Sequence, residues 1–307
     1  MPLANNQPAP FPRIHAVAVL LVAACAFASN HVAARIAFDD QAGLLLAILF
    51  RSGLCLLALA IIVLWQRQSI RLPAGSVRWQ LILGILIAIQ SFCMFSAVAR
   101  IPVAIALLIS NSFPILLALL TWALGGKPPT RKTCVLMGII LIGLLLVLDV
   151  PAQLSGNIDL GPDWSAGVMF ALTAATVFSF ALWITEHKLG NLVGTVRSLY
   201  TVGIIFVSMI IAGLAGLLPG GMNLPASSTG WIGLCTLAIL YTAAFSTLFV
   251  LIPRLDMARN SPVMNFEPVF SLFLGWMLLD QMLAPIQLTG GAIVLGSIVA
   301  LAYQRKG

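Results

Sequence analysis

One carboxyl group lies inside an otherwise apolar stretch near the C-terminus, at Glu267. If that stretch is a helix crossing a bilayer, its rise of 1.5 Å per residue places Glu267 about 15 Å deep, close to the midplane. A charge at that depth costs about 2.5–3.5 kcal/mol, so it requires a partner or a task. Glu267 can carry a proton across the membrane or hold an amine. The alternative is structural, a hydrogen bond to Asn265 or to backbone freed beside Pro268.

Two asparagines precede prolines in matching places. The stretch from Asn111 to Pro114 lies 154 residues before the stretch from Asn265 to Pro268. Proline removes one helical hydrogen bond and clashes with the carbonyl four residues back. Paired interruptions of this kind indicate a binding site near the midplane of a transporter. The alternative is a kink whose freed backbone is satisfied by the asparagine itself.

Two arginines also lie in apolar segments. Arg51 is roughly two turns from the nearer end of its segment, so we expect a carboxylate of the substrate or of the protein to pair with it. Arg197 lies within one turn of a segment end, where its side chain can extend to the lipid headgroups. The pairs Arg51-Ser52 and Arg197-Ser198 are a short echo between the two halves of the chain.

Four more side chains are candidates for a transport pathway. His31, beside Asn30, can titrate near neutral pH, or it is a hydrogen-bonded residue at the membrane interface. Trp183 and Tyr241 can line a cavity for a cation or a ring, or belong to the interfacial aromatic belts.

No pattern in the chain indicates catalysis, a cofactor or a metal. The three histidines are scattered, and no phosphate-binding loop, nucleophile elbow or zinc-ligand spacing is present. The five cysteines stand alone inside apolar segments. The basic residues form no patch for nucleic acid. We therefore expect neither an enzyme nor a nucleic-acid-binding protein, although an integral-membrane enzyme is the competing class.

The elements that position these residues are ten apolar segments. Hydrophobic residues make up 61% of the 307 residues and charged residues 8%, against about 25% charged in soluble domains. A span needs roughly 20 apolar residues, so very short loops must connect them. The chain thus predicts an all-α integral membrane protein with spans at Ile14–Ile36, Leu44–Trp65, Trp79–Ala99, Val103–Leu124, Lys132–Leu148, Ser165–Lys188, Gly194–Leu217, Trp231–Pro253, Met257–Leu279 and Ala284–Tyr303.

The spans divide into two repeats, residues 1–150 and 151–307. Because each repeat has five spans, the second must be inverted relative to the first. Lys and Arg gather in loops on one side, which indicates that both termini are cytoplasmic. Glycines at 138, 143, 290, 291 and 296 give the fifth and tenth spans small faces for close helix packing.

The repeated stretches resemble the duplicated module of the drug/metabolite transporter superfamily, in its EamA-type ten-span branch. Residues 104–148 and 258–303 carry the resemblance, above all Glu267-Pro268-Val269-Phe270 followed by Leu274-Gly275-Trp276. Asp280 follows the ninth span as in such modules, but Gly126 occupies the matching place after the fourth. The resemblance implies an inner-membrane exporter of small metabolites, such as amino acids, their derivatives or opine-type metallophores. A proton-coupled carrier is expected, with a multidrug or cation exporter of the same fold as the alternative; lipid surrounds it, and a homodimer is compatible with the family.

Overall fold

The computed structural model describes residues 11–73, 75–126, 128–149, 163–218, 221–251, 254–255 and 260–304. These residues form helices without any strand. An all-helical build follows from the composition, because backbone groups in lipid must bond within their own segment. The helices of the first half are α1 Arg13–Asp39, α2 Leu44–Trp65, α3 Ser76–Val98, α4 Val103–Ser110, α5 Phe113–Ala123 and α6 Arg131–Val147. Those of the second half are α8 Trp164–His187, α9 Gly194–Leu214, α10 Ser228–Leu251, the 3₁₀ helix η2 Ser261–Asn265, α12 Phe266–Leu279 and α13 Pro285–Gln304.

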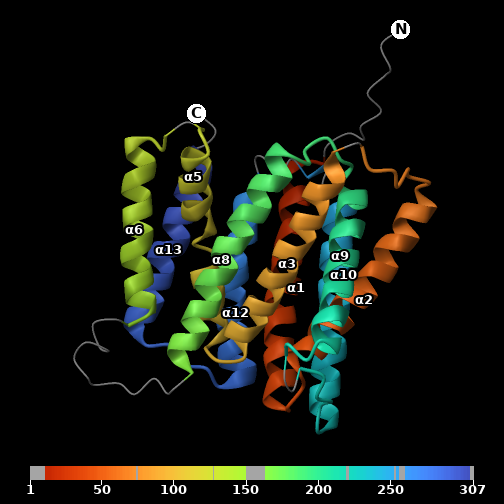
Figure 1. Cartoon of the computed structure of the whole chain (residues 1–307). Helices are drawn as coiled ribbons and strands as arrows, with labels where there is room; N and C mark the ends of the chain where they lie inside the picture. Colours follow the sequence, from red (N-terminus) through yellow and green to blue (C-terminus); the bar gives the residue numbers. More distant parts are fainter. Residues whose placement is uncertain are drawn as a thin grey trace.

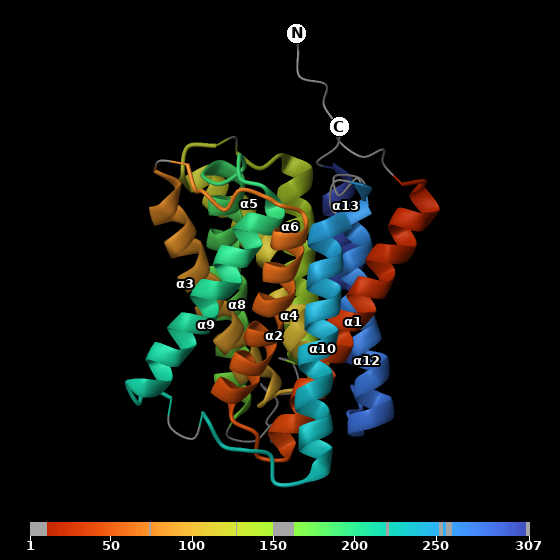
Figure 2. The same ribbon diagram turned by 90° about the vertical axis from the view of Figure 1, so that its right-hand side faces the viewer.

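The helices stand side by side as a bundle (Figure 1). Within the described residues, seven segments are long and apolar enough to span a membrane, α4 and α5 counting together as one. Two shorter apolar helices, Val263–Leu279 and Pro285–Ala300, and the 17-residue α6 complete ten segments at the predicted places. The start of α1 and the end of α13 lie at the same end of the bundle (Figure 2), as an even number of spans requires. We call this end the terminal end and the opposite one the distal end.

Helix contacts follow the two-repeat order. Helix α1 packs on α10 as its counterpart α8 packs on α3, and α2 meets α10 as α9 meets α3. Helices that are counterparts of each other, α2 with α9 and α6 with α13, also touch directly. Such a pattern arises when a pseudo-two-fold axis relates the halves. The predicted fold class, two inverted five-helix repeats, is confirmed.

In both interrupted spans the helix ends before the proline instead of bending at it. Helix α4 ends at Ser110 and α5 begins at Phe113, so Pro114 occupies the first turn of a new helix. A proline there loses nothing, because first-turn N–H groups have no helical partner. The η2–α12 junction repeats this arrangement, and Asn111 and Asn265 share the same backbone angles, φ −69° and ψ 0°.

Helices α6 and α13 approach each other closely through glycine. A Cβ atom added at Gly290 would lie 2.6 Å from the carbonyl oxygen of Gly143 and from the amide nitrogen of Val147. Only a residue without a side chain permits this backbone contact. The predicted small faces of the fifth and tenth spans are therefore used to pack one half against the other.

Candidate functional site

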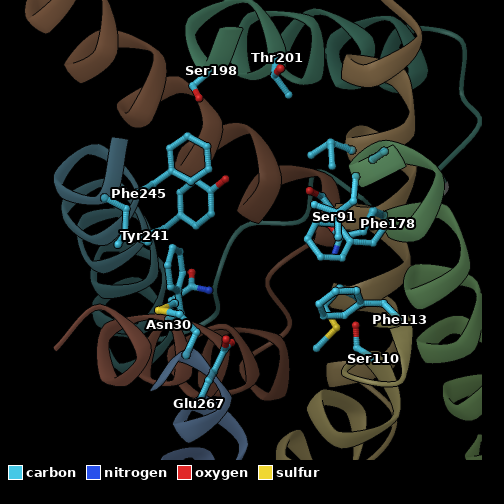
Figure 3. Close-up of a pocket in the computed structure, with 18 of the residues that line it drawn as sticks. Asn30, Ser91, Ser110, Phe113, Phe178, Ser198, Thr201, Tyr241, Phe245 and Glu267 are labelled. Carbon is cyan, nitrogen blue, oxygen red and sulfur yellow. The ribbon is translucent and has the colours of Figure 1, made fainter. Parts of the chain in front are cut away.

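A cavity of about 480 Å³ lies between the two halves. Helices α1, α2, α3, α4, α5, α8, α9, α10 and α12 and the 3₁₀ helix η2 all contribute side chains to it. Figure 3 shows Asn30, Tyr241 and Glu267 on one side and Ser110, Phe113 and Phe178 on the other. We call the first side the polar wall and the second the apolar wall.

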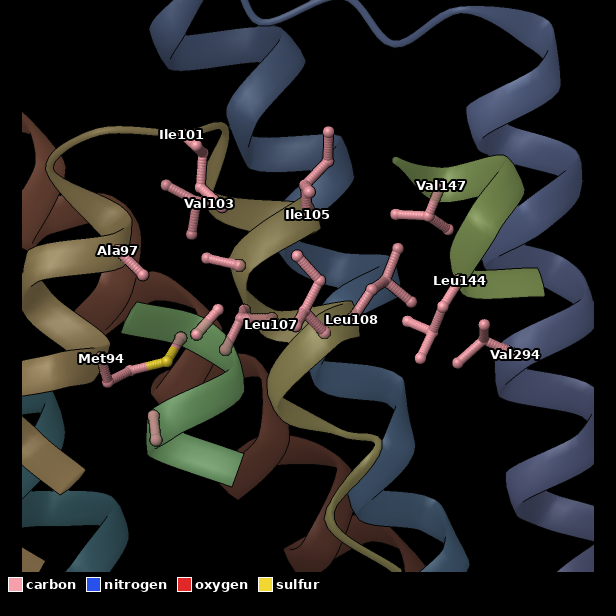
Figure 4. Packing of buried hydrophobic residues seen from close by; sticks show 14 of the residues in the cluster. Met94, Ala97, Ile101, Val103, Ile105, Leu107, Leu108, Leu144, Val147 and Val294 are labelled. Atoms are coloured by element: carbon pink, nitrogen blue, oxygen red, sulfur yellow. The ribbon is translucent and has the colours of Figure 1, made fainter. Parts of the chain in front are cut away.

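The cavity is closed toward the distal end. There, buried residues such as Ile101, Val103 and Ile105 pack tightly between the helices (Figure 4). A second cluster around Leu45 and Leu234 fills the neighbouring distal space. The cavity lining instead continues toward the terminal end, through Leu248 of α10 and Ser198 of α9. The lining therefore reaches toward the terminal end, whereas packed apolar residues occupy the distal end.

Glu267 and His31 contact each other in the polar wall. The Oε1 atom of Glu267 lies 3.6 Å from Nε2 of His31, and the His31 Nδ1 atom has no hydrogen-bond partner among the described residues. His31 also meets the ring of Phe95 edge to face, with 6.0 Å between the ring centroids. Because Phe95 is fully buried, it fixes the position of the imidazole. The sequence allowed His31 to be either an interfacial residue or a titrating group. In the structure it is buried against the Glu267 side chain.

Arg51 lies in the same wall and is only 6% exposed. Its Cζ atom is 4.4 Å from the ring centroid of Phe95 and 4.4 Å from that of Tyr241. Among the described residues no carboxylate comes within 4.0 Å of it. Tyr241 is held in turn by stacking on Phe245 and by an edge contact with Phe27. The protein thus holds a buried guanidinium between two aromatic faces, where cation–π attraction stabilises it.

Asn30 connects the polar wall to its support. With its amide oriented to satisfy both neighbours, Asn30 donates to the Leu237 carbonyl at 3.1 Å and accepts from the His31 backbone N–H at 3.3 Å. It is fully buried although it belongs to the cavity lining. Asn30 therefore joins α1 to α10 beside His31.

The apolar wall is built around an aromatic pair. Phe113 and Phe178 meet edge to face with 5.0 Å between centroids. Ser179 donates to the Ala175 carbonyl, and its Oγ lies 3.0 Å from the Phe113 carbonyl at the start of α5. This contact ties α8 to the interrupted fourth span, so that the aromatic pair faces the cavity.

The two walls occupy equivalent positions of the two repeats. A separation of 154 residues relates lining residues of α3, α4 and α5 to those of α10, η2 and α12, and a separation of 151 relates α1 to α8. The equivalent pairs are Ile87 and Tyr241, Ser91 and Phe245, Met94 and Leu248, Ser110 and Met264, Phe113 and Glu267, Phe27 and Phe178, Asn30 and Ala181, and His31 and Leu182. The cavity therefore lies on the pseudo-two-fold axis.

Most of the predicted candidates line the cavity, namely Asn30, His31, Arg51, Asn111, Tyr241 and Glu267. Asn265, Pro114 and Pro268 lie at the helix breaks but are not part of the lining. Depth along a helix can be read from the sequence, whereas the direction in which a side chain points depends on how the helix is rotated in the bundle. Asn111 belongs to the cavity lining, whereas Asn265 does not.

Trp183 is also outside the cavity. Its ring stacks on His187 at 4.8 Å, and the Lys188 ammonium lies 5.5 Å from its centroid. For Arg197 the sequence predicted a side chain that extends to the headgroups, but the residue lines the cavity. The Arg-Ser echo with Arg51 was the signal that could have identified it.

Sequence reasoning missed Ser91, Phe113, Phe178 and Thr201, which line the cavity. Serines, threonines and phenylalanines are ordinary in apolar helices; only Phe113 carried a signal, because it lies 154 residues before Glu267. Within the described residues, no three His, Cys, Asp or Glu side chains gather in a way that could hold a metal ion.

Comparison with known proteins gives a family and a fold. The sequence profile of the EamA-like transporter family matches residues 14–149 and again 165–303. A solved structure titled "Crystal structure of protein" is similar over 96% of this chain and 100% of its own, with 19% identity and a TM-score of 0.60, which supports the fold alone. No curated protein matches the chain. With a cavity between two repeats that each match this profile, the chain belongs to the EamA-like transporter family of multi-pass membrane transporters.

Proposed function

We propose that this transporter is a secondary active exporter of the bacterial inner membrane, with both termini in the cytoplasm. Its substrate is a small polar or amphiphilic metabolite, an amino acid or a compound derived from one. It works by alternating access and uses the proton gradient. The observation that carries this proposal is the polar wall, where a carboxylate and a guanidinium face one cavity on the pseudo-two-fold axis.

Opposite charges in one wall suit a substrate that carries both. The Arg51 guanidinium offers paired N–H donors to a carboxylate, and Glu267 offers oxygens to an ammonium group. The nearby apolar wall with Phe113 and Phe178 suits the carbon skeleton of the same molecule. A purely cationic drug would meet Arg51 at close range, which disfavours the multidrug alternative.

Proton coupling is assigned to Glu267. Its carboxyl group lines the cavity, and among the described residues His31 is the ionisable group in contact with it. A carboxyl that must bind either a proton or the substrate's amine exchanges one for the other. Opening first to one side and then to the other would convert that exchange into transport against a gradient.

Reconstituted protein tests the proposal. Proteoliposomes loaded with a panel of labelled amino acids are assayed for exchange at equal pH and for uphill movement under a pH gradient. The wild type should do both. Glu267→Gln should lose uphill movement and should exchange substrate only with a raised apparent KM, because the side chain then resembles a permanently protonated carboxyl that cannot pair with the substrate's amine. Glu186→Gln, an exposed site at the end of α8, is the matched control. Uphill transport by Glu267→Gln at the wild-type rate would overturn the coupling assignment.

A further inference from the structure

We propose that the substrate carries two acidic groups, one bound by Arg51 and the other by Arg197, in addition to its amine. This inference rests on the proposed function and narrows its substrate class. It follows from the placement of two arginines that both line the cavity.

The two arginines belong to equivalent helices of the two repeats. Each is followed by a serine, and they belong to α2 and α9, which are counterparts and pack against each other. Each of these two helices therefore brings one arginine to the cavity lining.

The cavity has an excess of positive charge. Among its lining residues, Arg51 and Arg197 are the cations, Glu267 is the anion, and His31 is neutral unless protonated. No described carboxylate lies within 4.0 Å of either arginine. Because a charge in a partly buried site is costly unless paired, an empty cavity leaves both guanidinium groups without a carboxylate partner. A substrate with one carboxylate would neutralise only one of them.

Arg197 is held in place with donors to spare. One of its terminal nitrogens donates to the Leu189 carbonyl at 3.4 Å. Its backbone carbonyl accepts from Thr201 Oγ1 at 2.9 Å and from Nε2 of Gln80 at 3.2 Å, and Gln80 is almost fully buried. A guanidinium has five N–H donors, so most of them remain for a ligand at this site.

The two arginines lie at different depths. Arg51 is seven residues from the distal start of α2, about 10 Å along the helix, and Arg197 is three residues from the terminal start of α9, about 5 Å. One acidic group would therefore lie on the distal side of the cavity and the other on its terminal side. An extended molecule with an acidic group at each end fits this arrangement.

A matched ligand series tests the inference. The probes are L-glutamate, L-2-aminoadipate and L-2-aminopimelate, each compared with the amide in which the side-chain carboxyl is replaced. Thermal stabilisation and inhibition of exchange are measured on the full-length protein in proteoliposomes or detergent. At least one diacid should bind the wild type at least about tenfold more tightly than its amide, the discrimination expected for one charged hydrogen-bonded pair.

Three arginine variants complete the design. Arg197→Gln should bind the diacid and its amide equally, and Arg197→Lys should restore part of the difference. Arg78→Gln, an exposed arginine stacked on Trp79 outside the cavity, should behave as the wild type. Equal binding of diacids and amides by the wild type, no binding of any diacid, or full discrimination by Arg197→Gln would overturn the inference. Proton-driven transport of a mono-acid that depends on Glu267 would leave the proposed function intact in each of these cases.

Discussion

The polar and apolar walls have the same backbone and opposite chemistry. Glu267, His31 and Asn30 in one wall correspond to Phe113, Leu182 and Ala181 in the other. Duplication therefore supplied the cavity and its axis, and divergence of the side chains supplied its polarity. The difference shows that two repeats with the same helix arrangement can carry different side chains on the two sides of the cavity.

The largest expected effect comes from exchanging the residues at one symmetric pair. In the double variant Glu267→Phe with Phe113→Glu, the carboxyl group faces Leu182 instead of His31. Substrate binding should weaken by about 1.5–3 kcal/mol, roughly 10- to 150-fold, for a lost charged hydrogen bond. Calorimetric titration and exchange assays measure the change, with Phe113→Leu as the control. Wild-type affinity in the double variant would mean that the two walls are interchangeable.

A substitution at the contact between α6 and α13 should change the stability of the protein without changing substrate binding by the walls. In Gly290→Ala, the new methyl group meets backbone atoms of α6 that cannot move aside, and such overpacking costs about 1–3 kcal/mol. The melting temperature should fall while the apparent KM for exchange stays constant. Gly296→Ala, where no neighbouring atom lies within 4 Å, should not lower the melting temperature. A shifted KM in Gly290→Ala would indicate that the packing of α6 on α13 also determines the geometry of the cavity.

Substitutions at Arg51 and at Tyr241, one of the two rings that contact it, should change substrate affinity less. Arg51→Lys keeps the charge but loses the planar group between Phe95 and Tyr241, which costs about 0.5–2 kcal/mol, roughly 2- to 30-fold in affinity. Tyr241→Phe keeps the ring face and should remain near the wild type. Ligand titration of both variants shows whether the rings hold Arg51 by cation–π attraction to its planar group or only by apolar packing. If Tyr241→Phe were the weaker binder, its hydroxyl rather than its ring would be the functional part.

The smallest effect is expected outside the membrane, at the distal loop after α1. A carboxylate oxygen of Asp40 accepts the Ser227 backbone N–H at 2.7 Å, which lowers the pKa of this carboxyl. Because the folded protein favours the ionised form, its stabilisation is present above the pKa of the unfolded chain, about 3.9, and is lost as pH falls through the folded value.

Asp40→Asn should therefore lower the melting temperature slightly at pH 7, and the difference from the wild type should shrink toward pH 3. Thermal unfolding across that pH range measures this trend. The equivalent residue in the other repeat, Asn191, is exposed, so Asn191→Ala is the matched control. A difference that grew on acidification would contradict the assigned role of Asp40.

Much of the fold could be predicted from the sequence, because lipid permits few structures. The ten apolar segments, the repeat of Asn111 and Pro114 in Asn265 and Pro268, and the family match to both halves agree with one another. Depth in the membrane also follows from counting along a helix, and this drew attention to Glu267 and Arg51. These inferences needed only composition, spacing and the rise of a helix.

Only the tertiary structure decided which of these side chains meet. Arg197 and Asn111 line the cavity, whereas Trp183 and Asn265 do not. Packing also gave Arg51 two aromatic rings where a carboxylate was expected. A helix that is apolar on every side carries no signal for its own rotation, so contacts between distant segments determine the site.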